Sequence, residues 1–466
     1  MNTRRLLSSS AIYGLADLAV VAVSGFLLLP LYTRALTQGE FGHYVAVRAN
    51  IDILTYAIHL GIPTAVARLY FEQKKAGTEH RYMSSVVWMF FAVLGVLGLA
   101  AAAWGAPLWR LLSPSVPVLP ALPYAFAISA LGFLGSLSII WLRSEGKAVA
   151  VLGLQLGTSA VMASVATGAL LGLGMQMEGI LLALLVGALV PAIALPVLFG
   201  RRFRWGAVRE DVTKTLHYAL PVLAGYIAYF VLNRFSTLLL QRHVSPEELG
   251  VFGLAQQLSM IVAMACTSFG AALQPMVFNS DAERVNESLL KAGRLLMSLM
   301  FLVTVGLMLF SRELVAIVAP RGYATGLGVL TVLAVGNFTL ASTLVSETAL
   351  LYHHRIKTSV GISIASAAVA AALGLWLVPT HHIVGGGLAV AGGLVTRMLL
   401  SQWAAWKLTG IFRFPLAVGG TVAAAVAGWF ALQVQALPLE ALPLLGIKVL
   451  ILSALLTALF LIHRKL

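Results

Sequence analysis

The sequence predicts an all-α polytopic membrane protein with about 14 transmembrane helices. It predicts two six-helix lobes in parallel repeat, followed by two extra C-terminal helices. Three observations support this fold class: the composition, the length of the apolar stretches, and a motif that recurs in the second half of the chain. The chain is 60% hydrophobic and 10% charged, whereas soluble domains carry roughly 25% charged residues. A soluble core could not bury this much apolar surface.

The apolar stretches are long enough to cross a bilayer, which requires about 20 residues per helix. They lack a period of two, so they predict helices rather than barrel strands. The basic N-terminus leads into an apolar stretch that is too long for a signal-peptide core, so we expect a retained first span. The predicted spans are 10–32, 42–67, 83–109, 120–142, 149–173, 178–199, 217–240, 250–276, 292–311, 327–351, 358–379, 384–406, 415–434 and 442–462.

The positions of the basic residues predict that both chain ends are cytoplasmic. With the N-terminus inside, twenty-two Lys and Arg residues fall in inner segments and five in outer segments. Cytoplasmic loops of membrane proteins concentrate Lys and Arg. This distribution explains most of the net charge of +14, so we expect no nucleic-acid partner.

The two halves of the chain share a motif. The stretch "TQGEFGHYVA" at 37–46 aligns with "SPEELGVFGL" at 245–254, and each copy fits a Ser/Thr-x-x-Glu capping box that opens a helix. Because six spans is an even number, both copies enter the membrane from the same side, as in parallel-repeat transporters. The matched residues are Arg34 and Arg242, Glu40 and Glu248, and Gly42 and Gly250.

The repeat predicts the domain boundaries. The longest inner loop separates the two halves, and the last two spans have no counterpart in the repeat. The predicted parts are an N-terminal lobe over 1–199, a cytoplasmic linker over 200–216, a C-terminal lobe over 217–407, and the extra spans over 408–466.

The sequence carries no signature of an enzyme. It has no nucleotide-binding Gly-Lys-Ser/Thr loop, and the Gly-rich segment 384–393 is typical of close helix packing. Adjacent histidines at 353–354 and 381–382 point apart on a helix, which disfavours a metal site. Cys266 is the single cysteine, so no disulfide framework is possible. We expect no catalytic residue, metal or cofactor.

The second predicted span carries a polar stripe. Arg48, Asp52, Thr55 and His59 step by four, three and four residues, which places them on one helical face. Charges at this depth are costly in lipid and usually face a bundle interior or a hydrated cavity. Two interpretations stay open: a structural Arg48–Asp52 pair that holds helices together, or a cavity wall in which Asp52 orients Arg48.

Further polar residues inside the predicted spans extend the candidate site. Tyrosines of the seventh span share a helical face with Asn233, and Gln256 occupies the position of Arg48 in the second repeat. Arg397 could instead snorkel toward the inner surface, and Lys448 is expected to snorkel or to make a helix–helix contact. The candidate substrate-binding residues are Arg48, Arg234, Arg397, Tyr226, Tyr229, Asn233 and Gln256.

Four ionisable residues are candidates for coupling transport to an ion gradient. They are Asp17, Asp52, His59 and Glu347, the intramembrane groups able to exchange protons or bind sodium. The arginines, by contrast, favour an anionic ligand, since guanidinium binds phosphate through paired hydrogen bonds. The accompanying tyrosines could stack on sugar rings. A small inorganic cation as the substrate would require an excess of carboxylates.

Five stretches carry a family resemblance: "LLLPLYTRALTQGEFGHYVAV", "LGIPTAVARLYFE", "ALPVLAGYIAYFVLNRFSTLLL", "LGVFGLAQQL" and "RELVAIVAPRGYATGLGVL". They resemble the polysaccharide transporter family, the O-antigen or oligosaccharide flippases of the multidrug/oligosaccharidyl-lipid/polysaccharide exporter superfamily. The resemblance covers nearly the whole chain and is strongest in spans one, two, seven, eight and ten. One departure is Asn233-Arg234, where many members have Asp-Arg.

The resemblance implies a two-lobed flippase in the bacterial cytoplasmic (inner) membrane. Its substrate would be an undecaprenyl-pyrophosphate-linked oligosaccharide, the repeat unit of an O-antigen, capsule or exopolysaccharide. Transport from the inner to the outer leaflet would use alternating access through a cationic central cavity, coupled to protons or sodium. Polysaccharide polymerase and assembly proteins would be partners alongside membrane lipid.

Three alternatives stay open. A multidrug or toxin extruder of the same superfamily would exchange organic cations for protons or sodium, and the carboxylates Asp17, Asp52 and Glu347 are compatible with it. A flippase of the peptidoglycan precursor lipid II would share the anionic lipid carrier. A membrane protein without transport activity is the third alternative.

Overall fold

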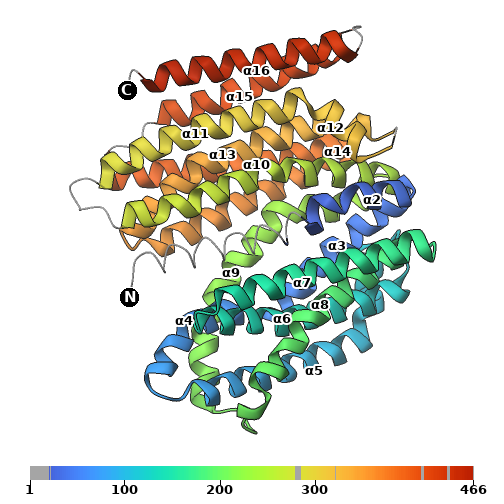
Figure 1. Cartoon of the computed structure of the whole chain (residues 1–466), viewed down its shortest axis with the longest axis vertical. Coiled ribbons are helices and arrows are strands. Elements are labelled where there is room, and N and C mark those ends of the chain that lie inside the picture. Colours follow the sequence, from blue (N-terminus) through green and yellow to red (C-terminus); the bar gives the residue numbers. More distant parts are fainter. Residues whose placement is uncertain are drawn as a thin grey trace. The chain divides into compact units, whose positions relative to one another are not determined.

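The structure is a computed structural model, and it describes residue 20 and residues 23–278, 285–320, 322–410, 414–437 and 441–464 (Figure 1). Every regular element in these ranges is a helix. By packing, the chain divides into two units: Met1–Phe230 with Ser245–Gly250, and Val231–Val244 with Val251–Leu466. The predicted all-α membrane fold is confirmed.

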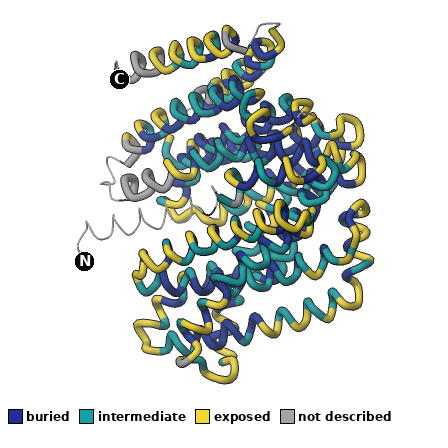
Figure 2. The backbone as a smooth tube through the Cα atoms, turned by 45° about the vertical axis from the view of Figure 1, so that its right-hand side comes forward, coloured by how far each residue is buried: buried dark blue, intermediate teal, exposed yellow. Residues whose placement is uncertain are grey.

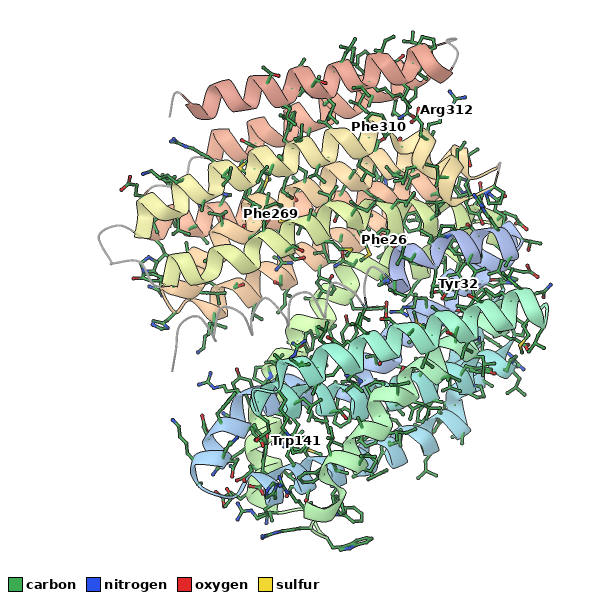
Figure 3. The ribbon with its side chains drawn as sticks, in the orientation of Figure 1. Phe26, Tyr32, Trp141, Phe269, Phe310 and Arg312 are labelled. Atoms are coloured by element: carbon green, nitrogen blue, oxygen red, sulfur yellow. The ribbon has the colours of Figure 1, made fainter. Side chains whose placement is uncertain are left out.

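The first unit is built around α6. This helix packs against α3, α4, α5, α7 and α8, and its Phe133 ring stacks on Phe90 of α5 at 4.5 Å between centroids. Trp141, near the end of α6, lies in the same apolar core (Figure 3). The helices are η1 (Val23–Leu27), α2 (Leu29–Ala35), α3 (Gln38–His59), α4 (Ile62–Lys75), α5 (Glu79–Leu112), α6 (Val118–Ser144), α7 (Ala148–Thr167), η2 (Gly168–Gly172), α8 (Met177–Phe199) and η3 (Gly200–Arg202).

The second unit is built around α13, which packs against α11, α14 and α15. In the predicted repeat α6 is the fourth span and α13 the tenth, so each unit is centred on the equivalent helix. The remaining helices are α9 (Arg209–Leu240), α10 (Pro246–Phe278), α11 (Val285–Leu309), α12 (Ser311–Val318), η4 (Tyr323–Gly326), α13 (Leu327–Tyr352), α14 (Ile356–Thr409), α15 (Phe414–Gln435) and α16 (Ala441–Arg464). Helices α9 and α10 each contribute to both units.

The described residues contain 11 helices that are long and apolar enough to cross a membrane. The 54-residue α14 contains both the eleventh and twelfth predicted spans as two helical segments, which a kink at His382 joins through non-helical backbone (φ 48°, ψ −128°). Exposed residues recur along the flanks of the helices (Figure 2). They include large apolar side chains such as Leu99 and Val197, which suit a lipid environment. Most of the predicted first span lies outside the described residues.

The predicted second span lies within Gln38–Lys75, which is long and apolar enough to cross a membrane, and it is divided between two helices. Helix α3 ends at His59, Leu60 and Gly61 adopt left-handed φ values of 48° and 74°, and α4 begins at Ile62. A Cβ added to Gly61 would lie 2.6 Å from the carbonyl oxygen of Ala219. Pro63 lies in the first turn of α4, where its missing N–H leaves no hydrogen bond unmade. It therefore helps to begin a helix.

Both predicted capping boxes are present. Thr37 Oγ1 accepts from Glu40 N at 3.3 Å, and Glu40 Oε2 accepts from Thr37 N at 2.7 Å. The equivalent distances between Ser245 and Glu248 are 3.3 and 3.4 Å. These contacts satisfy backbone donors that a helix start leaves unpaired.

The two capped helix starts also cross each other within the first unit. A Cβ on Gly42 of α3 would lie 1.8 Å from the carbonyl oxygen of Pro246, and a Cβ on Gly250 would lie 2.6 Å from that of Gln38. The matched glycines of the repeat therefore permit backbone-to-backbone contact between α3 and the first turn of α10.

Candidate functional site

Arg48 and Asp52 form a loose ion pair on α3. Arg48 Nε lies 3.7 Å from Asp52 Oδ1, and 41% and 22% of the two side chains are exposed. This distance is longer than the 2.7–3.2 Å typical of an N–H···O hydrogen bond. Asp52 therefore compensates the charge of Arg48 without fixing the orientation of its guanidinium group.

Three tyrosines lie near Arg48. Tyr32 of α2 and Tyr44 and Tyr56 of α3 lie close enough to interact with its charge. The rings of Tyr32 and Tyr44 meet edge to face at 5.8 Å. Tyr32, labelled in Figure 3, is 2% exposed, and its hydroxyl has no hydrogen-bond partner among the described residues. Aromatic rings and hydroxyl groups thus lie in the neighbourhood of the guanidinium, and such groups can contact both an anion and a sugar.

The inner half of the polar stripe packs against α6. Thr55 Oγ1 donates to Ser129 Oγ at 3.1 Å, and His59 Nε2 donates to the Ser129 carbonyl oxygen at 3.3 Å. The His59 ring also meets the Phe133 ring edge to face at 5.4 Å. Thr55 and His59 therefore fasten α3 to α6, whereas Arg48 and Asp52 remain partly exposed.

Tyr226 joins the tyrosine cluster of the first unit. Its ring stacks on Tyr56 at 5.7 Å, and its hydroxyl lies 2.6 Å from Thr64 Oγ1. Tyr56 thus connects two predicted site residues, Arg48 and Tyr226. Tyr229, one turn along α9, is 48% exposed.

Arg234, Gln256 and Asn233 come together in the second unit. Arg234 Nη1 donates to Gln256 Oε1 at 3.0 Å, and Gln256 Nε2 donates to the Asn233 carbonyl oxygen at 2.8 Å. Gln256 therefore holds α10 to α9 and orients the arginine. The repeat places a neutral amide here at the position that Arg48 occupies in the first unit.

Arg397 and Glu347 form a paired ion contact between α14 and α13. Arg397 Nε donates to Glu347 Oε1 at 2.9 Å and Nη2 donates to Oε2 at 3.0 Å, with 18% and 17% of the side chains exposed. The predicted roles of the two residues were separate, substrate binding for the arginine and ion coupling for the carboxylate. In the structure the two residues form one bidentate ion pair, so any role of either residue involves the other.

Polar contacts hold the two C-terminal helices, α15 and α16, to α12. Lys448 of α16 is 0% exposed, and its Nζ lies 2.5 Å from Glu313 Oε1 of α12. The neighbouring Arg312 donates to the carbonyl oxygen of Gln435 in α15 at 3.0 Å (Figure 3). Lys448 makes the helix–helix contact that was one of its two predicted roles.

A polar cluster joins the ends of α4 and α6 on the predicted cytoplasmic side. Glu145 Oε1 accepts from Lys74 Nζ at 2.6 Å and from the Tyr70 hydroxyl at 2.8 Å, and Trp141 Nε1 donates to that hydroxyl at 3.0 Å. Burial acts to raise the pKa of Glu145, but the hydrogen bonds and the lysine charge outweigh it, so the pKa lies below its usual value.

Sequence reasoning missed the tyrosines around Arg48. Tyr56 follows Asp52 by four residues and shares its helical face, so the same periodicity could have identified it. Tyr32 lies on a separate helix, and only tertiary structure brings it to Arg48. Asp17, a predicted coupling residue, lies outside the described residues.

The comparisons with known proteins give the family. A family described as polysaccharide biosynthesis protein matches residues 7–280. The chain belongs to this family. No curated protein sequence matches the chain.

Solved structures share the fold of this polysaccharide biosynthesis protein. A lipid II flippase MurJ in an inward closed conformation has a TM-score of 0.73 at 12% identity, covering 99% of this chain and 98% of that chain. An inward-facing multidrug resistance MATE family transporter of the MOP superfamily has a TM-score of 0.64 at 17% identity, covering 86% and 95%. An outward-facing structure of the same description has a TM-score of 0.56 at 16% identity, covering 87% and 95%. The chain is a multi-pass membrane protein with the fold of MOP-superfamily transporters.

Proposed function

We propose that this protein is a flippase for undecaprenyl-pyrophosphate-linked oligosaccharide, moving it from the inner to the outer leaflet of a bacterial cytoplasmic membrane. Membership of a polysaccharide biosynthesis family supports a glycan substrate. The fold likeness to a lipid II flippase, which extends over 99% of this chain, supports a lipid-linked one.

The loosely held Arg48 is the observation that carries this proposal. An arginine inside a membrane span is costly unless it meets polar groups. At 41% exposure and 3.7 Å from its carboxylate, Arg48 can leave Asp52 for a stronger acceptor. A pyrophosphate offers such an acceptor because it can receive paired hydrogen bonds from guanidinium. The tyrosines beside Arg48 suit the sugar that follows the phosphate.

The same binding of phosphate by guanidinium and of sugar by polar and aromatic groups assigns roles to other candidate residues. In the second unit, Arg234, oriented by Gln256, offers a guanidinium for phosphate and Asn233 offers a polar group for sugar. In the first unit, Tyr229 offers an aromatic face for sugar. Asp52 compensates Arg48 in the absence of substrate.

The coupling groups are proposed from their chemistry alone. Asp52 and Glu347 are carboxylates paired with arginines, so binding of a proton or sodium at either would release its partner. His59 and Asp17 complete the predicted set.

Complementation of a deletion strain tests the proposal. The wild-type gene should restore surface glycan, and Arg48→Ala should not, although the protein reaches the membrane at normal levels. Arg48→Lys should restore part of the glycan, since a point charge retains attraction but loses the paired geometry. Equal glycan from wild type and Arg48→Ala would overturn the role of Arg48.

A lipid II flippase is the second candidate, because the fold likeness to MurJ covers nearly the entire chain. The same deletion strain separates the candidates. Loss of surface glycan with normal peptidoglycan supports the proposed function, accumulation of peptidoglycan precursors supports the second candidate, and drug sensitivity alone supports a cation extruder.

A further inference from the structure

The segment 203–208, which connects η3 to α9, is fastened to the first two turns of α5. Arg204 N donates to Ser84 Oγ at 2.9 Å, and Val208 N donates to Ser85 Oγ at 3.0 Å. Ser84 and Ser85 are buried, so both hydrogen bonds lie where water does not compete for them. The segment therefore presents its side chains from a fixed backbone beside α5.

Four aromatic rings gather where this segment meets α5, and we call Trp88, Phe91, Phe203 and Trp205 the aromatic cluster. The Trp88 ring lies 6.3 Å from Phe203 and 5.6 Å from Trp205, between centroids. The Phe203 and Trp205 rings lie 6.1 Å apart, and Phe91 lies 6.5 Å from Trp88. Trp205 is 84% exposed and Phe91 is 50% exposed. Exposure of such rings to water is unfavourable, whereas tryptophan is favoured at the interface between membrane and water.

The length of α5 places the aromatic cluster at that interface. The helix has 34 residues, which gives it a length of about 51 Å by helical rise. Because the hydrocarbon core of a bilayer is about 30 Å thick, roughly 10 Å of each end lies at the level of the head groups. Trp88 is about 14 Å from the beginning of α5, close to the boundary between head groups and hydrocarbon. Further along the same helix, Val96 and Leu99 are 67% and 75% exposed, as expected of side chains that face lipid.

Positive charge lies on and beside the same segment. The carboxylates that follow it in α9 already have basic partners. Glu210 pairs with Lys214. Asp211, which is 1% exposed, accepts from Arg81 Nε and Nη2, each at 3.2 Å. These pairs leave the exposed guanidinium groups of the segment to external anions, and guanidinium binds phosphate through paired hydrogen bonds. The exposed arginines are Arg202, Arg204 and Arg209.

We propose that the surface formed by the aromatic cluster and these three arginines binds a phospholipid with a net negative head group in the cytoplasmic leaflet. Arg202 and Arg204 donate to the head-group phosphate, while the Trp205 and Phe91 rings lie against the glycerol region and the first methylenes of the acyl chains. A zwitterionic phospholipid brings an ammonium group toward the same arginines, so it binds more weakly. A lipid fits this surface better than a cytosolic protein does, because the aromatic cluster continues onto the lipid-facing side of α5. The bound lipid holds the linker between the two halves of the chain at the membrane surface.

Lipid binding by the purified protein tests the arginines. Native mass spectrometry should show that wild type binds phosphatidylglycerol more tightly than phosphatidylcholine with identical acyl chains. Arg202→Gln/Arg204→Gln should bind phosphatidylglycerol roughly 10- to 30-fold more weakly, because each arginine near a negative surface contributes about a factor of five. Arg355→Gln/Lys357→Gln is the matched control, since it removes two exposed charges from the predicted cytoplasmic side of the second unit. Equal affinity of wild type and Arg202→Gln/Arg204→Gln, or an equal loss in the control, would overturn the proposal.

The surroundings of Trp205 distinguish a lipid from a cytosolic partner. In nanodiscs that contain phosphatidylglycerol, the fluorescence lost in Trp205→Phe reports on this one side chain. Lipids brominated near the glycerol end of their acyl chains should quench that signal, and iodide in the aqueous phase should leave most of it. The signal lost in Trp141→Phe is the control, because Trp141 is 3% exposed and should respond less to either quencher. Quenching of the Trp205 signal by iodide and not by brominated lipid would show that the ring faces the cytosol, and would contradict the proposal.

Discussion

The two arginine–carboxylate pairs differ in geometry, and this difference separates their roles. Arg397 and Glu347 make a paired contact at 2.9 and 3.0 Å with less than a fifth of either side chain exposed. Arg48 and Asp52 lie 3.7 Å apart and are more exposed. Short paired hydrogen bonds hold α13 and α14 in register, whereas the longer contact leaves Arg48 able to exchange partners.

Removal of one partner from the tighter pair should destabilise the second unit. Glu347→Leu leaves Arg397 without its carboxylate, and breaking a buried pair in this way typically costs about 3–5 kcal/mol. The double variant Glu347→Leu/Arg397→Leu should recover most of the loss, because no lone charge remains. Thermal unfolding in detergent measures both effects, and a double variant as unstable as the single one would contradict a pairwise contact.

Glu145 should make stability depend on pH in the acidic range. Its folded pKa is depressed, so its contribution is present above the unfolded pKa of about 4.3 and is lost as pH falls through the folded value. At pH 7 wild type should melt at a higher temperature than Glu145→Gln, and the difference should shrink below about pH 4. A difference that stays constant from pH 7 to pH 3 would show that the negative charge of Glu145 does not contribute to stability.

At the scale of elements, the crossing of α3 and the first turn of α10 depends on glycine. A Cβ on Gly42 would come within 1.8 Å of the Pro246 carbonyl oxygen, and backbone cannot yield as a flexible side chain does. The repeat explains why both helices carry a glycine one turn after the start of a capping box.

Gly42→Ala should therefore separate the two helix starts. Overpacking typically costs about 1–3 kcal/mol, so the variant should unfold at a lower temperature and lose transport. Gly95→Ala is the matched control, because Gly95 is also helical and a Cβ there meets nothing within 4 Å. Thermal unfolding and surface-glycan assays compare the two, and a Gly42→Ala protein as stable and active as Gly95→Ala would refute the close crossing.

Local patterns predicted helix starts well and helix breaks poorly. The capping boxes at Thr37 and Ser245 are short-range signals, and both are present. The apolar pattern does not mark the break at Leu60–Gly61, because it continues through these residues, and the closeness of Gly61 to Ala219 is a tertiary contact. The same limit applied to the site: periodicity placed Arg48 and Asp52 on one face, but it could not pair Arg397 with Glu347 across 50 residues.

At the scale of the whole molecule, the basic residues predict the membrane orientation. Reporter fusions after Lys75, Arg204 and Arg355 should read cytoplasmic, because positively charged loops stay inside. Fusions within 112–118 and 242–247 should read external. Two or more reversed reporters would contradict the fourteen-span arrangement and the parallel repeat.

Transport by the whole molecule, as proposed, depends on Arg48 binding the pyrophosphate of a lipid-linked oligosaccharide. Purified protein in vesicles that contain labelled undecaprenyl-pyrophosphate oligosaccharide tests this role most directly, with movement between leaflets as the readout. Wild type should move the lipid, and both Arg48→Ala and Arg48→Ala/Asp52→Ala should fail, because the guanidinium itself contacts the substrate. Transport restored in the double variant would show that Arg48 serves only to neutralise Asp52, and would contradict its role as a substrate ligand.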